Sequence, residues 1–232
     1  ICHSVPLQTA YDNGCIKSAD KSIFILGDSY AASLFSGIDE LVKKRYNDYT
    51  IKQLTDGNGP LFLNKEGETN EGTSLVQINN DRIDAVQKNK PSIVLIAWMI
   101  NGKNGIPDKI EATARLVATV NEIKKVSPYS RVIVIGPVPE WNITLHRQVI
   151  NFYHANHKPP PRYMSYGLNF EIKSWDKYLR DQLQIADVEY ISAYEQLCNQ
   201  DGCLTRVSNN ISDLSAVDWG HLTKSGSIFL IN

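Results

Sequence analysis

Five short apolar runs alternate with longer stretches of helical periodicity, and this alternation limits the fold more than any other feature of the chain. Runs without polar alternation, such as Ile23-Phe-Ile-Leu26, are typical of strands buried on both faces. Strands that alternate with helices form a parallel sheet covered by helices on both sides. The sequence therefore predicts an α/β domain with a five-stranded parallel sheet, with strands at about 22–27, 50–54, 92–98, 131–136 and 188–191.

Helical periodicity fills the intervals between these runs. We expect helices at about 29–45, 75–89, 108–126, 170–186 and 223–230, the first with Gly37 inside it. Residues 1–21 have little periodicity and are interpreted as an N-terminal extension lying on the domain. The stretch 142–167 combines aromatic residues, histidines and prolines, which predicts an insertion or lid rather than core.

Composition limits the class of protein and its partners. A chain of 232 residues with 42% hydrophobic residues is ordinary for one soluble globular domain. The formal net charge of −1 leaves no basic excess to neutralise phosphates, which argues against nucleic acid as a partner. No apolar run approaches the ~20 residues that span a bilayer, and no signal peptide is visible. Because the chain opens on Ile1 rather than Met, we expect a fragment of a longer protein.

The four cysteines fall into two local pairs, Cys2 with Cys15 and Cys198 with Cys203. Their spacings match no zinc motif, and neither a metal nor an organic cofactor is expected. Two short-range disulfides, Cys2–Cys15 and Cys198–Cys203, would indicate an oxidising compartment. The alternative is four reduced, buried thiols.

The first expected strand runs directly into Gly27-Asp28-Ser29, and a helix follows. A serine in such a turn lies beside the N–H groups of a helix N-terminus, which stabilise developing negative charge. Ser29 is therefore a candidate nucleophile. The alternative is that Ser29 only caps the helix, while Asp28 is expected to bond neighbouring N–H groups in the turn.

A serine nucleophile needs a base and a group that orients the base, and Asp218-Trp-Gly-His221 contains both residue types. An Asp three residues before a His can place its carboxylate on the imidazole Nδ1. The alternative is a helix cap with an incidental histidine. Since ligands bind at the carboxyl ends of parallel strands, we expect Ser29, Asp218 and His221 to meet at that edge of the sheet.

Taken together, Gly27-Asp28-Ser29 and Asp218 to His221 resemble the first and last sequence blocks of the SGNH/GDSL hydrolase superfamily. The resemblance covers nearly the whole domain and implies a flavodoxin-like three-layer α/β/α sandwich. It implies that Ser29 is the nucleophile, His221 the base and Asp218 the group that orients it. The reactions implied are hydrolysis or transfer of acyl groups, often acetyl groups on sugars.

The same resemblance implies an oxyanion hole of three donors. These are the N–H of Ser29, a glycine N–H after the second strand, for which both Gly57 and Gly59 are candidates, and an asparagine side chain. Asn101 is the nearest match to that asparagine but is shifted, and Asn104 competes with it. The alternative is a polar loop without a catalytic asparagine.

Aromatic and histidine side chains are further candidates for substrate contact. Trp98, Trp141 and Trp219 are expected near the site, either packing against sugars or belonging to the core or rim. His154 and His157 are interpreted as the surface of the insertion, from which they could contact substrate.

A narrower resemblance rests on Ile135-Gly-Pro-Val-Pro-Glu140, on the paired cysteines and on the block from Asp218 to Gly226. These resemble the SGNH domain fused behind a membrane acyltransferase-3 domain. The resemblance implies an O-acetyltransferase acting on a bacterial surface polysaccharide such as lipopolysaccharide O-antigen. It also implies a periplasmic domain of an inner-membrane protein, in which residues 22–232 transfer the acyl group and residues 1–21 join them to the membrane domain that supplies it. The alternatives are a carbohydrate acetylesterase with the same triad and a non-catalytic polysaccharide-binding module.

Overall fold

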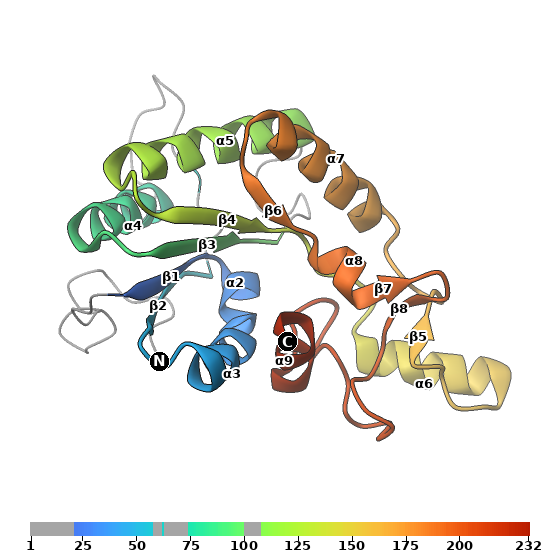
Figure 1. Cartoon of the computed structure of the whole chain (residues 1–232). Coiled ribbons are helices and arrows are strands. Elements are labelled where there is room, and N and C mark those ends of the chain that lie inside the picture. The colour runs from blue at the N-terminus through green and yellow to red at the C-terminus, as the bar shows by residue number, and fades with distance from the viewer. Residues whose placement is uncertain (1–20, 58–61, 63–73, 100–107) are drawn as a thin grey trace.

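A five-stranded parallel sheet runs through the centre of the molecule (Figure 1). The computed structural model describes residues 21–57, 62, 74–99 and 108–232 of the chain. The strand order is β2-β1-β3-β4-β6, and every neighbouring pair is parallel. The predicted strands are confirmed as β1 (Ser22–Gly27), β2 (Thr50–Thr55), β3 (Ile93–Ala97), β4 (Arg131–Ile135) and β6 (Glu189–Ile191).

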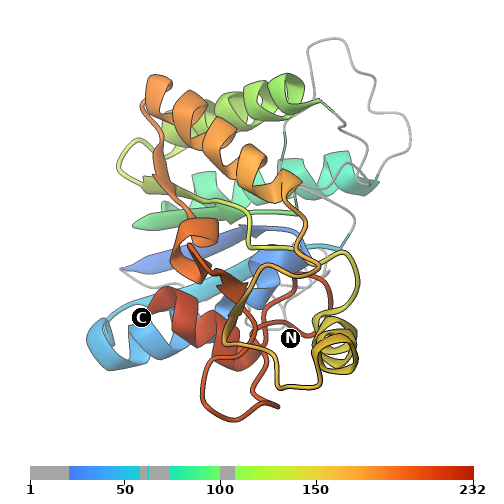
Figure 2. The same ribbon diagram turned by 90° about the vertical axis from the view of Figure 1, so that its right-hand side faces the viewer.

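Helices cover both faces of this sheet, as the α/β/α prediction requires (Figures 1 and 2). Alternate residues of β1 point to opposite faces, so that Phe24 belongs to the hydrophobic cluster that contains residues of α4, α5 and α7, while Ile25 belongs to the cluster that contains residues of α3 and α9. The described helices are α2 (Ser29–Ser33), α3 (Phe35–Arg45), α4 (Ser74–Asn89), α5 (Lys109–Val126), α6 (Leu145–Asn156), α7 (Glu171–Ile185), α8 (Ala193–Leu197) and α9 (Lys224–Ile231).

The single helix predicted over 29–45 is wrong, because the chain forms two helices that meet at Leu34. The N–H of Leu34 donates to Ala31 O, three residues back, instead of continuing the four-residue pattern. Burial of the Leu34 side chain in the core favours this tighter turn.

The stretch 142–167 contributes α6 and the short strand β5 (Tyr163–Met164). β5 pairs with β8 (Gly202–Leu204), which in turn pairs with β7 (Cys198–Asn199), in a small antiparallel sheet. A third hydrophobic cluster lies beneath these elements and contains Trp141, Leu145, Met164, Leu168, Ile172, Tyr194, Cys203 and Ala216. Whether the stretch acts as a lid stays a prediction.

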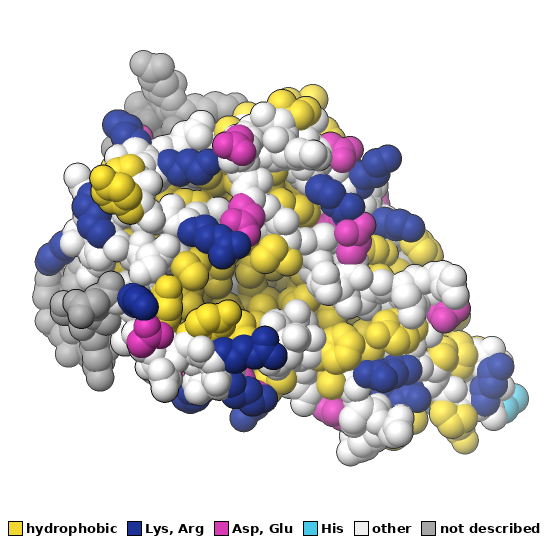
Figure 3. Space-filling view, in the orientation of Figure 1, with side chains coloured by type: hydrophobic (Ala, Val, Ile, Leu, Met, Phe, Trp, Pro, Cys, Tyr) yellow, Lys and Arg dark blue, Asp and Glu magenta, His cyan; other side chains and the backbone are white. Residues whose placement is uncertain are grey.

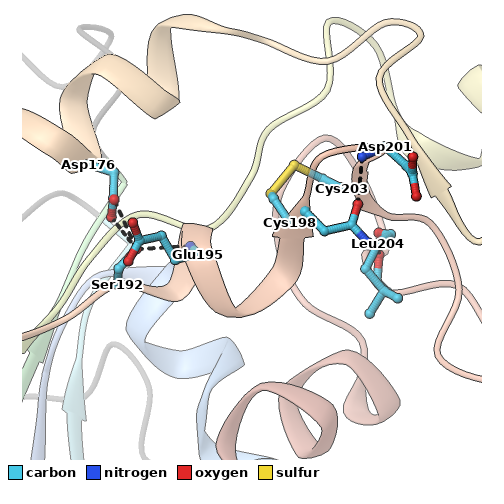
Figure 4. The surroundings of a disulfide bond; sticks show 9 residues. Asp176, Ser192, Glu195, Cys198, Asp201, Cys203 and Leu204 are labelled. Carbon is cyan, nitrogen blue, oxygen red and sulfur yellow. Dashed lines mark hydrogen bonds between the residues drawn. A yellow bond between two sulfur atoms is a disulfide. The ribbon is translucent and has the colours of Figure 1, made fainter.

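A disulfide joins Cys198 to Cys203 across the β7–β8 hairpin, with an S–S distance of 2.01 Å (Figure 4). This confirms the second predicted pairing. The first prediction falls on Cys2 and Cys15, which lie outside the described residues.

An apolar hollow of about 430 Å³ remains on the face of the sheet that α3 and α9 cover in part (Figure 3). Its lining includes Ile93, Leu95, Ile133, Ile135 and Leu230. In the described part of the chain, no helix combines the length and the hydrophobicity needed to cross a membrane.

Candidate active site

The turn that carries Ser29 depends on a glycine at the end of β1. Gly27 has a φ of 142°, and a Cβ there would lie 1.8 Å from Ala97 O of the neighbouring strand. No other residue fits this position without moving β3. The turn can therefore pass close to the end of β3 before α2 begins.

Asp28, rather than Ser29, caps α2. One oxygen of the Asp28 carboxylate accepts a hydrogen bond from Tyr30 N at 2.8 Å, and the other accepts one from Met99 N at 2.8 Å. The structural role expected for Asp28 is confirmed, and the alternative of Ser29 as the cap is wrong. Burial raises the pKa of Asp28, while the backbone N–H groups that bond to it partly oppose this rise.

The structure brings together Ser29, His221 and Asp218, which come from opposite ends of the chain. Ser29 Oγ lies 2.7 Å from His221 Nε2, and His221 Nδ1 lies 2.7 Å from Asp218 Oδ2. The side chains of His221 and Asp218 are 23% and 25% exposed, so small molecules can reach them. This is the arrangement of a nucleophile, a base and a carboxylate that orients the base.

The conformation of the Asp218 loop explains why three residues of spacing suffice. Asp218 Oδ1 accepts hydrogen bonds from Gly220 N and His221 N, each at 2.9 Å, which leaves Oδ2 to bond the imidazole. The cap of α9 is Thr223, whose hydroxyl accepts from Gly226 N. The alternative that Asp218 caps a helix is therefore wrong.

Backbone hydrogen bonds from Trp141 and Leu145 support this loop. Leu145 N donates to Asp218 O at 2.8 Å, and Trp141 N donates to Trp219 O at 2.7 Å. Figures 1 and 2 both place α6 beside the chain that leads from β8 to α9. Sequence reasoning missed this support, because any residue except proline can donate such a bond.

Tyr30, which packs against the histidine, and Glu140, which lies near Tyr30, are both buried, and sequence reasoning assigned neither to the site. The Tyr30 ring packs against the His221 ring with centroids 4.4 Å apart. Burial and the nearby Glu140 carboxylate raise the pKa of Tyr30 far above its ordinary value, so that the phenol stays neutral. A Cβ at Gly220 would lie 2.4 Å from Tyr30 Oη, which explains the glycine before His221.

The expected oxyanion hole is only partly within the described residues. Ser29 N lies at the start of α2, and Gly57 lies two residues after the end of β2. Between β2 and Gly57, Asp56 donates its N–H to Gly27 O at 3.0 Å. Gly59, Asn101 and Asn104 lie outside the described residues. The assignment of the donors therefore stays a prediction.

The tryptophans divide between core and surface. Trp98 and Trp141 are 5% and 3% exposed and pack in hydrophobic clusters, Trp98 against Phe62. Trp219, next to Asp218, is 40% exposed and can contact a ligand. His154 and His157 are exposed on α6 and at its C-terminal end.

Comparison with known proteins connects this geometry to a family. A family model described as "SGNH domain (fused to AT3 domains)" matches residues 1–232. The periplasmic domain of a lipopolysaccharide acetyltransferase from Salmonella ser. Paratyphi A is 49% identical, with a TM-score of 0.92 over 100% of this chain and 88% of that one. A search of the curated proteins found no match.

More distant structures share the fold alone. A protein from Bacteroides fragilis is 14% identical, with a TM-score of 0.56 over 96% of this chain and 90% of that one. A carbohydrate acetylesterase family member from Sinorhizobium meliloti is 9% identical, with a TM-score of 0.52 over 91% of this chain and 93% of that one.

Proposed function

The chain belongs to the family of SGNH domains fused to AT3 domains, and from this we propose that it transfers acetyl groups to a sugar hydroxyl of a bacterial surface polysaccharide. The observation that carries the proposal is the continuous chain of hydrogen bonds from Ser29 Oγ through His221 to Asp218. The similarity to the Salmonella lipopolysaccharide acetyltransferase domain supports acetyl as the group and a surface glycan as the acceptor.

The first half of the reaction acylates the enzyme. Ser29 Oγ attacks the carbonyl carbon of the acetyl donor while its proton passes to His221 Nε2. The carbonyl oxygen becomes an oxyanion, for which we propose two donors, the N–H of Ser29 and that of Gly57, the one of the two glycine candidates that lies within the described residues. When the intermediate collapses, the bond to the donor breaks, and His221 returns the proton to the leaving group.

The second half transfers the acetyl group. A sugar hydroxyl attacks the acetyl-serine ester while His221 Nε2 takes its proton, and collapse of the second intermediate releases Ser29 Oγ, which recovers that proton. Asp218 accepts from Nδ1 throughout, so Nε2 faces the serine in the form that accepts a proton. No step draws on a metal or an organic cofactor.

A carbohydrate acetylesterase would use the same residues, with water in place of the sugar hydroxyl. The partial exposure of His221 gives water access to the acetyl-serine ester, and this favours the esterase as the second candidate function. A purely glycan-binding module would need neither the 2.7 Å contact between Ser29 and His221 nor the contact between His221 and Asp218.

The proposed partners are the polysaccharide acceptor and a fused membrane acyltransferase domain that delivers the acetyl group. We place the domain in the periplasm, as a part of an inner-membrane protein. The Cys198–Cys203 disulfide supports an oxidising compartment.

The test is a Ser29→Ala substitution in the complete protein within its bacterial host. We expect loss of acetyl groups from the surface glycan, since Ser29 Oγ is the hydroxyl that His221 Nε2 contacts. Ser33→Ala, one helical turn later on α2, is the matched control and should leave acetylation unchanged. Acetylation that persists in Ser29→Ala, with the protein present at normal level, would refute the catalytic role.

A purified domain distinguishes transfer from hydrolysis. With an aryl acetate as donor and a glycan as acceptor, a transferase places acetyl on the sugar, whereas an esterase releases acetate regardless of the sugar. Acetate as the sole product at saturating glycan would favour the esterase.

A further inference from the structure

A buried arginine lies under the turn that carries Ser29. Arg82, on α4, is 3% exposed and uses its guanidinium to bond three acceptors. Nη2 donates to Gly27 O at 2.6 Å, Nε donates to Leu54 O at 3.0 Å, and Nη1 donates to Asn79 Oδ1 at 2.7 Å. Two of these acceptors are backbone carbonyls at the carboxyl ends of β1 and β2.

These two strand ends are the ones that present the expected oxyanion donors. Gly27 O lies two residues before Ser29, and it accepts from Asp56 N as well as from Arg82. Leu54 lies three residues before Gly57. One planar guanidinium therefore bonds both the backbone just before the nucleophile turn and the backbone just before the turn that follows β2.

The companion residue Asn79 extends this connection along α4. Its Nδ2 donates to Phe62 O at 2.9 Å, beyond the turn that follows β2. Arg82 and Asn79 thus hold backbone on both sides of that turn from a single helix.

The charge of Arg82 is retained although the side chain is buried. Burial lowers the pKa of Arg82 to about 10, and the carboxylates of Asp56 and Asp28 oppose that fall. The guanidinium is thus protonated at neutral pH. A buried charged side chain often stabilises a fold less than an apolar side chain of the same volume would. We therefore look for the role of Arg82 in the geometry that its hydrogen bonds impose.

We propose that Arg82 is a positioning residue for acyl transfer, which fixes the N–H groups of Ser29 and Gly57 at the spacing that binds the oxyanion. Arg82 is buried and touches no substrate, so its effect passes through Gly27 and Leu54. The inference rests on the proposed function and adds a residue to its machinery. Donors of an oxyanion hole act only when held in place before the reaction, and small displacements cost large factors in rate.

The test compares an aryl acetate with its thionoacetate, in which sulfur replaces the carbonyl oxygen. Sulfur accepts weaker hydrogen bonds than oxygen, so an intact oxyanion hole accelerates the oxygen ester far more than the thionoester. We expect Arg82→Met to lower kcat/KM for the oxygen ester about 10²-fold and to lower it much less for the thionoester. Arg82→Lys, which keeps the charge and one donor group, should recover part of the loss.

Asp176→Asn is the matched control for a disturbed buried charge. The Asp176 carboxylate accepts hydrogen bonds from Arg180 on α7, from Tyr190 on β6 and from Ser192 just before α8. Figure 4 shows the contact between Asp176 and Ser192. None of these three donors lies at the end of β1 or β2. Its loss should lower the melting temperature and leave the ratio of the two ester rates unchanged.

The possible results distinguish a failure of the role proposed for Arg82 from a failure of the proposed function. A parallel loss on both esters in the folded Arg82→Met protein, or an unchanged rate, would overturn the positioning role while the proposed function stands. If Arg82→Met does not fold, the ratio in Arg82→Lys decides, and a wild-type ratio there overturns the role. Ester turnover that survives in Ser29→Ala would instead contradict the proposed function itself.

Discussion

At the scale of single residues, the site contains carboxylates in contrasting surroundings. Asp218 is a quarter exposed and bonds His221, whereas Asp28 is 2% exposed and bonds the backbone N–H groups of Tyr30 and Met99. Asp28 belongs to the motif Gly27-Asp28-Ser29, and Asp218 belongs to the motif that ends at His221. Their different burial gives them different tasks and, for Asp28, a raised pKa.

The raised pKa of Asp28 predicts a pH effect on stability. The folded protein binds this proton at a pH at which the unfolded chain, with its value near 3.8, has lost it. Above the pKa of Asp28 in the folded protein, the contribution of Asp28 to the free energy of unfolding does not change with pH. As the pH falls from that value towards the pKa in the unfolded chain, this contribution becomes more stabilising. We expect wild type to gain stability relative to Asp28→Asn in urea titrations from about pH 7 to about pH 4.

Asp48→Asn provides the opposite sign as a control. The hydrogen bond from Lys21 lowers the pKa of the exposed Asp48, so its contribution is present above the unfolded pKa and is lost as pH falls through the folded one. A difference between wild type and Asp28→Asn that is flat, or that moves in the Asp48 direction, would contradict the account of Asp28.

Residues whose chemistry is specific could be predicted from the sequence, and residues whose role comes from contacts could not. Ser29, Asp218 and His221 are recognisable because nucleophilic catalysis needs these types at a turn and at this spacing. Arg82, Tyr30 and Glu140 are assigned by what they touch: two backbone carbonyls, an imidazole ring and a phenol. Such contacts join segments far apart in the chain, and no local pattern encodes them.

At the scale of elements, α9, the helix that follows the His221 loop, packs closely against α3. α9 begins three residues after His221, and its backbone passes directly against Gly37 of α3. Gly37 N donates to Ser227 Oγ at 2.9 Å, and a Cβ at Gly37 would lie 2.2 Å from Ser227 O. Glycine is unfavourable inside a helix, but at position 37 the close packing of α9 against α3 requires it.

Gly37→Ala tests this contact by the sign of its effect. Helix propensity alone would stabilise the variant by about 1 kcal/mol. Because the new methyl group would push α9 away, we expect instead a loss of about 1–3 kcal/mol in the free energy of unfolding, measured by urea denaturation. Ser36→Ala, at the neighbouring position, should show no such loss, and a stabilised Gly37→Ala would contradict the close approach.

The strands β1, β3 and β4 could be predicted because buried parallel strands are continuous apolar runs. The shorter apolar signals of β2, which contains Lys52 and Gln53, and of β6 gained weight from their alternation with helices. α6 is not among the helices predicted from the sequence, because the histidines and prolines near it indicate an exposed insertion. Its inward residues Leu145, Val149 and Phe152 recur at helical spacing and pack into the third cluster. The two- and three-residue strands β5, β7 and β8 are too short for any periodic signal.

At the scale of the whole molecule, the fold joins the two ends of the chain in one site. Ser29 and His221 are 192 residues apart in sequence and 2.7 Å apart in space. β1 places the serine at the carboxyl edge of the sheet, while α9 and the backbone around Trp141 and Leu145 hold the Asp218 loop against it. The shared edge follows from the parallel topology, but the distance follows only from the packed structure.

The central claim is that Ser29 carries the acetyl group between donor and acceptor. The direct measurement is mass spectrometry of the domain, quenched with acid shortly after mixing with an aryl acetate. The account predicts one acetyl group per chain, on the peptide that contains Ser29, in wild type and in Ser33→Ala, and none on that peptide in Ser29→Ala. An acetyl group at another residue, or equal labelling in Ser29→Ala, would contradict it.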